Sequence, residues 1–143
     1  MSIQVIGTVY TKKGQEGDFD WHIRSGKYPD ALFLFNDDEQ RHHWKKAGAG
    51  NAVIRKYNQH ALAIPRSHGI VTGNRVGYSS LTDEAREAID RCLEEVRELI
   101  QRYGYTQVYY SAIEPNGLLG TGIFDVGMDV REYITQQIWA LGA

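Results

Sequence analysis

The chain has 143 residues, of which 42% are hydrophobic and 24% charged, and its formal net charge is -2. This length suits one domain with one core and is too short for two. The slightly acidic balance gives no bias toward nucleic acid, and no apolar run approaches the roughly 20 residues that span a bilayer. We therefore expect a single domain over residues 1–143 that binds neither nucleic acid nor membrane.

The N-terminus and the cysteine content indicate the compartment. The chain does not start with a basic segment followed by an apolar block, and it lacks a small-residue cleavage pattern, so no signal peptide is expected. Cys92 is the only cysteine in the sequence, which excludes an internal disulfide and any multi-cysteine metal site. We expect a cytoplasmic protein in which Cys92 is a buried apolar residue.

The first third of the chain predicts three strands. Residues 3–11 alternate well enough for a strand, and residues 19–24 are expected to form a second, short one. Residues 31–35 form a continuous apolar run that stops at Asn36-Asp37-Asp38-Glu39. Such a run is typical of a central parallel strand that is buried on both faces.

The middle of the chain is rich in glycine. Residues 51–57 follow Ala47-Gly48-Ala49-Gly50 and are expected to form a short helix. Residues 61–65 predict another brief strand, closed by Pro65, and a long loop is expected to follow through Gly69, Gly73 and Gly77. A loop of that length is often functional.

The last third predicts two helices and one strand. Thr82 is a good N-cap, Asp83 and Glu84 suit the first turn of a helix, and Gly104 supplies its C-terminal stop. Between them, apolar residues recur at steps of three and four. Residues 108–112 predict a strand, and residues 128–141 a second helix with one apolar face.

The alternation of apolar strands and helices predicts a three-layer α/β sandwich with a mixed sheet. Ligands of such sheets bind beyond the carboxyl ends of the strands. Two glycine-rich loops follow predicted strands directly, namely loop one (residues 36–51) and loop two (residues 114–127). We expect the two loops to border one crevice.

Both loops have the composition of a diphosphate site. Small residues expose consecutive backbone N–H groups near helix N-termini, and these donors and the helix dipole favour anions. The alternative is that the glycines are turn residues only. Neither loop is followed by Gly-Lys-Ser/Thr, and neither has the GxGxxG spacing, so a P-loop or a classical dinucleotide fingerprint is disfavoured.

The chain order of the Asn-Asp-Asp strand end, AGAGNAVI, YYSA and GLLGTGIFDVG resembles the macrodomain superfamily, which binds ADP-ribose and related nucleotides. It also resembles a group of bacterial and phage proteins without an assigned function, which share a glycine-rich loop, an Asn-Ala pair and a later Ile-Pro. The resemblance covers roughly residues 31–138 and implies a macrodomain-like fold.

Carried over residue by residue, the resemblance implies that the GTGIF segment of loop two wraps the diphosphate, with Phe124 beside the ribose. It matches the AGAG segment to the first loop and Asn36 to the first asparagine of the family's strand end. Glu39 stands where the family has its last asparagine, and Asn51 lies near an aspartate of some hydrolytic members, so binding is favoured over hydrolysis. The expected ligand-binding residues are Asn36, Gly48, Gly50, Asn51, Gly120, Thr121, Gly122, Ile123 and Phe124.

Asp37 and Asp38 are the candidates for a general base or a base-recognising carboxylate, because they end a buried strand beside a ligand loop. Capping of the strand end is the other interpretation. The expected function is binding of an ADP-ribose-like small molecule. Two alternatives stay open, a hydrolase of ADP-ribosyl or nucleoside bonds that uses this acidic segment, and a non-catalytic interaction protein. No cofactor is expected, and the oligomeric state is open.

The histidines and arginines of the middle segment carry weaker signals. Adjacent side chains such as His42 and His43 diverge, whereas a divalent ion needs three or four convergent ligands, so a solvated polar loop and no metal site are expected. His68 is expected to be structural or exposed. Arg55 is a candidate clamp for a phosphate, with a solvated face as the alternative.

Overall fold

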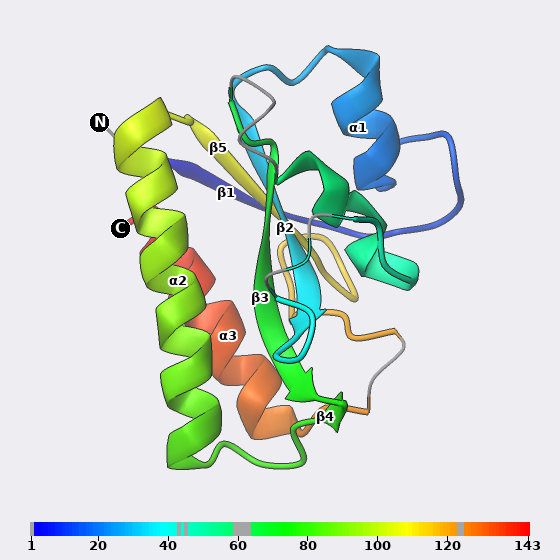
Figure 1. Ribbon diagram of the computed structural model, residues 1–143. Coiled ribbons are helices and arrows are strands. Elements are labelled where there is room, and N and C mark those ends of the chain that lie inside the picture. Colours follow the sequence, from blue (N-terminus) through cyan, green and yellow to red (C-terminus); the bar gives the residue numbers. More distant parts are fainter. Residues whose placement is uncertain (1, 43, 45, 59–63, 123–124) are drawn as a thin grey trace.

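The computed structural model describes residues 2–42, 44, 46–58, 64–122 and 125–143 (Figure 1). The elements in chain order are β1 (Gln4–Thr8), α1 (Phe19–Ser25), β2 (Ala31–Asp38), the 3-10 helix η1 (Gly50–Tyr57), β3 (Ser67–Asn74), β4 (Val76–Gly77), α2 (Asp83–Tyr103), β5 (Gln107–Ser111) and α3 (Met128–Ala140).

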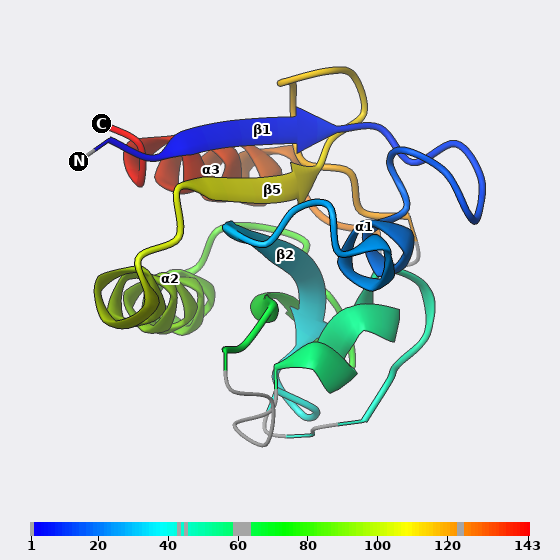
Figure 2. The ribbon, with the colours of Figure 1, turned by 90° about the horizontal axis from the view of Figure 1, so that it is seen from above.

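One five-stranded sheet with the order β1-β5-β2-β3-β4 organises the molecule. The first four strands in this order are parallel, and the two-residue β4 pairs with the end of β3 in the antiparallel direction. Figure 2 shows β5, which is late in the sequence, between β1 and β2. The predicted α/β character of the fold is confirmed.

Helices lie on both sides of the sheet. In Figure 1, α2 and α3 lie on one side, and α1 and η1 on the other. The buried side chains form two clusters, one on each side of the sheet. One cluster contains Leu32 and Leu34, and the other contains Phe33 and Phe35. Successive residues of a strand point to opposite faces. The continuous apolar run of β2 is therefore explained by burial on both faces.

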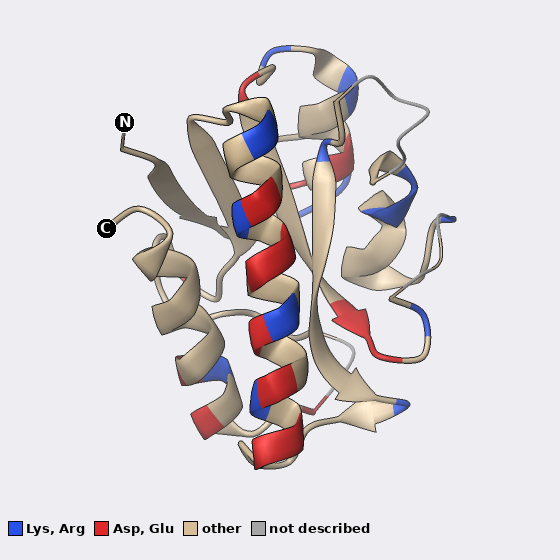
Figure 3. Cartoon of the chain, turned by 60° about the vertical axis from the view of Figure 1, so that its left-hand side comes forward, with Lys and Arg blue, Asp and Glu red and all other residues tan. Residues whose placement is uncertain are grey.

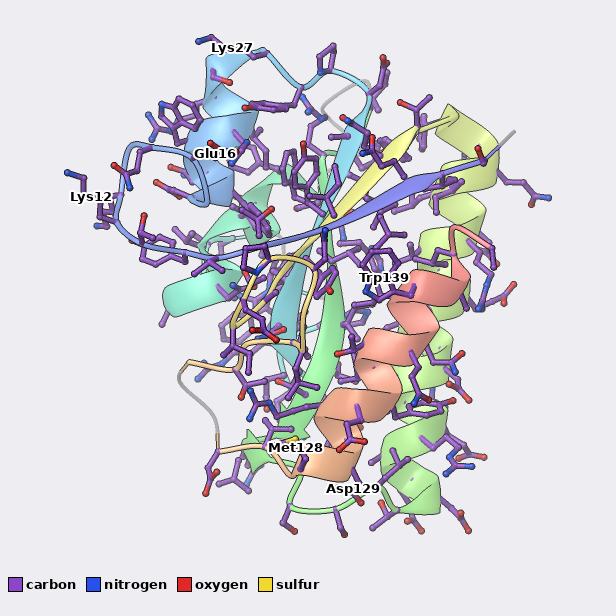
Figure 4. The ribbon with its side chains drawn as sticks, turned by 180° about the vertical axis from the view of Figure 1, so that it is seen from behind. Lys12, Glu16, Lys27, Met128, Asp129 and Trp139 are labelled. Carbon is purple, nitrogen blue, oxygen red and sulfur yellow. The ribbon has the colours of Figure 1, made fainter. Side chains whose placement is uncertain are left out.

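The helix α2 follows its sequence signals closely. The Thr82 hydroxyl accepts a hydrogen bond of 3.1 Å from the backbone N–H of Ala85, and Gly104 ends the helix at a φ of 72°. Ala85, Ile89 and Val96 lie on its buried face, which packs against the sheet and α3. Figure 4 shows α3 from behind, with Met128 and Asp129 at its N-terminal end and Trp139 near its other end.

The expected strand at residues 19–24 is wrong, because this segment forms the helix α1. The Asp18 side chain accepts a hydrogen bond from the backbone N–H of Asp20, and Gly26 ends the helix at a φ of 71°. Phe19, His22 and Ile23 are its buried residues. Their spacing of three and four is helical, and the short window hid that period among polar residues.

The expected long loop after Pro65 is also wrong, since residues 67–74 form β3, which pairs with β2. A Cβ atom at Gly69 would meet the carboxylate and Cβ of Asp37. Glycine in this strand thus makes room for a charged side chain on the neighbouring strand. Most of the expected strand at residues 61–65 lies outside the described residues.

Within the described ranges, the model contains no helix with the length and apolar character needed to cross a membrane.

Candidate functional site

The two glycine-rich loops leave the sheet from neighbouring strands. Loop one leaves β2 toward η1, and loop two leaves β5 toward α3, and these two helices lie on opposite sides of the sheet (Figure 1). β2 pairs with β5 only over residues 31–33 and 107–109, although both strands continue further. Neighbouring parallel strands whose connections diverge in this way form a topological switch point, the usual place for a ligand in an α/β sheet.

Three side chains close the end of the sheet at this switch point. The backbone N–H of Asn36 donates to Asn51 Oδ1 at 2.9 Å, and Asn51 Nδ2 donates to the Ser111 hydroxyl at 2.9 Å. Asn36 Nδ2 donates to the backbone carbonyl of Gly120 at 2.6 Å. The residues expected from both loops therefore meet at one place, although Asn36 and Gly120 are 84 positions apart.

Loop one folds tightly onto η1. The Gly48 N–H donates to the carbonyl of Ala52 at 2.9 Å, and a Cβ atom at Gly48 would lie 2.7 Å from Arg55 Nη1. Gly50 has a φ of 56°, in the left-handed region that favours glycine. No side chain of the described residues caps the N-terminus of η1. Its first N–H groups are therefore suited to an anion.

One backbone donor of loop two is bonded within the fold, while another part of the loop is exposed. The Gly120 N–H donates to the carbonyl of Ser111 at 2.9 Å, so this donor is occupied. Thr121 is half-buried and Gly122 is exposed. A Cβ atom at Gly122 would meet no described heavy atom within 4 Å. Ile123 and Phe124 lie outside the described residues.

Asp37 is held in a buried ion pair. Its Oδ1 accepts a hydrogen bond from Arg55 Nη2, and its Oδ2 lies 3.0 Å from His42 Nδ1. Burial by itself would raise the pKa of Asp37, but the hydrogen bonds to His42 and Arg55 outweigh it and hold this pKa below its ordinary value. Asp37 is therefore an ionised structural anchor at neutral pH, which makes it a weak general base.

Asp38 and Glu39 also hold neighbouring segments. Asp38 is buried, and its carboxylate accepts hydrogen bonds from the backbone N–H groups of Gln40 and Arg75, at 3.0 Å and 2.5 Å. Glu39 accepts a hydrogen bond of 2.5 Å from the Tyr78 hydroxyl, and burial together with this bond raises the pKa of Tyr78. These contacts favour the interpretation of the acidic segment as a cap of the strand end.

Arg55 lies beneath loop one with an exposed fraction of only 3%. The expected solvated face is thus wrong for Arg55. Its guanidinium pairs with Asp37 and lies over the Phe35 ring, and its Nε has no hydrogen-bond partner among the described residues. Figure 3 shows Lys and Arg on η1, and acidic and basic residues interspersed along α2. Arg55 therefore supports loop one from below.

A second cluster of polar side chains lies on the α2 side of β3. His42 Nε2 lies 2.8 Å from Glu95 Oε1, His68 Nε2 lies 3.0 Å from the same oxygen, and Cys92 Sγ lies 3.8 Å from His42 Nε2. Burial would lower the pKa of His42, but its contacts with Asp37, Cys92 and Glu95 raise it to about 12. The expected solvated loop is therefore wrong for His42, whose side chain is 15% exposed. His43 lies outside the described residues.

Sequence reasoning missed this cluster because its members come from three separate segments. One local signal was present, since Cys92 and Glu95 are three residues apart on a helix and share a face. The two histidines carry no comparable signal in their own segments. Only the pairing of β2 with β3, under α2, brings them together.

A surface hollow of about 360 Å³ lies between loop two and α3. Its lining residues are Leu118, Glu132, Thr135, Gln136 and Trp139. None of the residues expected to bind the ligand lines this hollow. The candidate site is therefore the junction of the two loops at Asn36, and the hollow is a separate feature of the surface.

Comparison with protein-family models, with curated proteins and with solved structures found no match to this chain.

Proposed function

We propose that the protein binds an ADP-ribose-like nucleotide at the junction of loop one and loop two. One observation carries the proposal, namely that Asn36 donates hydrogen bonds to both Asn51 and Gly120. These bonds hold the two glycine-rich loops together at the carboxyl ends of β2 and β5. This edge of a parallel sheet is where α/β proteins hold nucleotides.

The donors for a diphosphate come from the backbone. The N-terminus of η1 has no side-chain cap among the described residues, and the backbone at Gly122 borders open space. Backbone N–H groups at such places bind phosphate oxygens without a long cationic side chain. This agrees with Arg55, which is already paired with Asp37 and serves as support.

The proposal includes the finer fold assignment, a macrodomain-like three-layer α/β sandwich. Helices on both sides of a mainly parallel sheet support it, as does the GTGIF segment that follows β5. The proposed ligand is a small molecule, and its ribose would lie beside the part of loop two that follows Gly122.

Binding is better supported than hydrolysis. A general base needs a pKa near the working pH and a carboxylate that reaches the substrate. Asp37 is ionised within a buried ion pair, and the carboxylate of Asp38 accepts two backbone hydrogen bonds. We therefore propose a binding protein in which the acidic segment shapes loop one.

Calorimetric titration with ADP-ribose, NAD and ADP tests this function. Gly122→Val places its Cβ atom where no described heavy atom lies within 4 Å, so the fold should be kept, while the new side chain blocks the approach of a phosphate. The expected loss of affinity is about tenfold or more, equal to roughly 1.4 kcal/mol. Ser80→Val, in the exposed loop before α2, is the matched control and should bind like the wild type. Absence of binding by every adenine or ribose diphosphate at millimolar concentration would overturn the proposal.

A further inference from the structure

Three side chains with metal-binding atoms converge on the α2 side of β3, and a fourth contacts one of them. His42 follows β2, His68 lies on β3, and Cys92 and Glu95 lie on α2. One ligand atom from each of His42, Cys92 and Glu95 lies within 4.8 Å of the others. His68 Nε2 lies 3.0 Å from Glu95 Oε1, so His68 contacts this group from the side of Glu95.

The spacing of these atoms suits a tetrahedral ion. Bonds of about 2.0–2.3 Å to zinc place neighbouring ligand atoms about 3.3–3.8 Å apart. The separations are 2.8 Å for His42 to Glu95 and 3.8 Å for His42 to Cys92, and all three ligand atoms lie within 4.8 Å of one another. Small side-chain movements would therefore admit an ion, and rotation about the torsions of Glu95 supplies part of them.

The outer contacts hold the imidazole of His42 in the orientation that a metal site requires. His42 Nδ1 lies 3.0 Å from Asp37 Oδ2, and Arg55 fixes that carboxylate from its other side. The ring therefore donates from Nδ1 and turns Nε2 toward Glu95, as ligating histidines typically do. His68 Nδ1 accepts from the side-chain amide nitrogen of Asn58 at 3.2 Å, so His68 Nε2 carries the proton that it donates to Glu95.

The residues of the cluster differ in burial. Cys92 is 3% exposed, and the side chains of His42 and His68 are 15% and 9% exposed. The side chain of Glu95 is 47% exposed, so an ion would enter past this residue. The donor set of one imidazole nitrogen, one sulfur and one carboxylate oxygen favours zinc over magnesium or calcium.

We propose that His42, Cys92 and Glu95 form a binding site for one zinc ion, with His68 holding the Glu95 carboxylate in place. The ion takes the place of the hydrogen bond between His42 and Glu95, and the imidazole of His42 and the thiol release their protons as it binds. The site ties α2 to the segment after β2. It is independent of the nucleotide proposed above, because none of its residues belongs to that ligand set.

Cobalt titration of the chelator-treated, reduced protein tests the site directly. We expect one equivalent of Co²⁺ to give the visible absorption of a tetrahedral ion together with a thiolate charge-transfer band, and Zn²⁺ to displace it. Cys92→Ala should remove the charge-transfer band. Glu95→Gln should weaken Zn²⁺ binding about tenfold or more. Mg²⁺ should not compete.

Glu94→Gln is the matched control, because Glu94 is the exposed neighbour of Glu95 and its carboxylate forms a surface ion pair with Arg97 instead. It should bind Zn²⁺ like the wild type. Zn²⁺ should raise the melting temperature of the wild type and of Glu94→Gln, and should do so less for Glu95→Gln. Since Glu95 is half exposed, this variant should fold even if Cys92→Ala does not. Failure to bind one equivalent, or equal binding by Glu95→Gln and the wild type, would leave an ion-pair cluster and overturn the proposal.

Discussion

The side-chain amide of Asn36 donates a hydrogen bond of 2.6 Å to the backbone carbonyl of Gly120. The backbone N–H of Asn36 is bonded to the side chain of Asn51, which reaches Ser111 at the end of β5. β2 and β5 no longer pair at this level of the sheet. Hydrogen bonds of side-chain amides thus replace the backbone hydrogen bonds between β2 and β5 at the place where loop one and loop two approach each other.

Asn36→Ala should separate the two loops. The substitution leaves the partly buried carbonyl of Gly120 without this donor, at a cost of about 1–2 kcal/mol in the free energy of unfolding. The affinity for ADP-ribose should also fall, by about tenfold, because the loops are no longer held at one spacing. Urea denaturation and calorimetric titration measure the two effects.

Asn74→Ala is the control for this variant, since the Asn74 side chain bonds to Gln40 at the exposed end of β3. It should change the free energy of unfolding by less than about 0.5 kcal/mol. If Asn36→Ala binds ADP-ribose as tightly as the wild type, the ligand does not bind between the two loops.

Asp37→Ala should be severely destabilising. It leaves the guanidinium of Arg55 buried without its counter-charge, which costs about 3–5 kcal/mol for a buried ion pair that loses one partner. Denaturant unfolding would show this loss. Asp20→Ala removes an acidic residue of a more exposed pair with Arg24, and should cost clearly less. Equal losses in the two variants would contradict a structural role for Asp37.

Much of the fold was predictable where local signals agreed with burial. The helix α2 has a capping threonine, a terminal glycine and a full apolar period, and β2 has an uninterrupted apolar run. Both elements were expected within a few residues of their bounds. The sequence also led us to expect loop one and loop two beside each other, because carboxyl ends of parallel strands share one edge, and the contact of Asn36 with Gly120 agrees with that expectation.

The predictions from sequence were wrong or incomplete where tertiary contacts determine the local structure. The sequence of β3 contains Gly69 and Gly73, which favour a loop, yet Gly69 is required by the Asp37 side chain on the neighbouring strand. In α1, the short length concealed the helical spacing of its buried residues. The cluster of His42, His68 and Glu95 depends on three segments packing together, and no single segment carries that information.

Gly69→Ala should therefore destabilise β3. The added Cβ would lie 2.8 Å from the Cβ of Asp37 and 2.9 Å from Phe35 Cε2, so both side chains must move within a packed region. Overpacking of this kind costs about 1–3 kcal/mol. Gly122→Ala, where a Cβ meets no described heavy atom within 4 Å, should stay within about 0.5 kcal/mol of the wild type in the same denaturation experiment. A Gly69→Ala protein as stable as Gly122→Ala would contradict the tight contact with Asp37.

The hydroxyl of Tyr57 on η1 donates a hydrogen bond of 2.6 Å to Asp20 on α1. Burial is the main cause that raises the pKa of Tyr57 from its ordinary value of 10.0 to about 12, and this hydrogen bond is the second. The folded protein thus keeps the Tyr57 proton at pH values where the unfolded chain has lost it. The resulting stabilisation is complete below the unfolded value, and it disappears as the pH rises from 10.0 to about 12.

Tyr57→Phe removes this contribution. Its free energy of unfolding should be about 1 kcal/mol lower than that of the wild type near neutral pH, a modest figure because solvent screens this half-exposed pair. The difference should shrink as the pH rises through 10.0 toward 12, since the wild type then loses what the variant lacks. Urea denaturation at a series of pH values measures it, with Tyr10→Phe, at an exposed tyrosine, as the control. A constant difference across this pH range would show that the hydrogen bond to Asp20 does not hold the Tyr57 proton, and that α1 and η1 are joined by apolar packing alone.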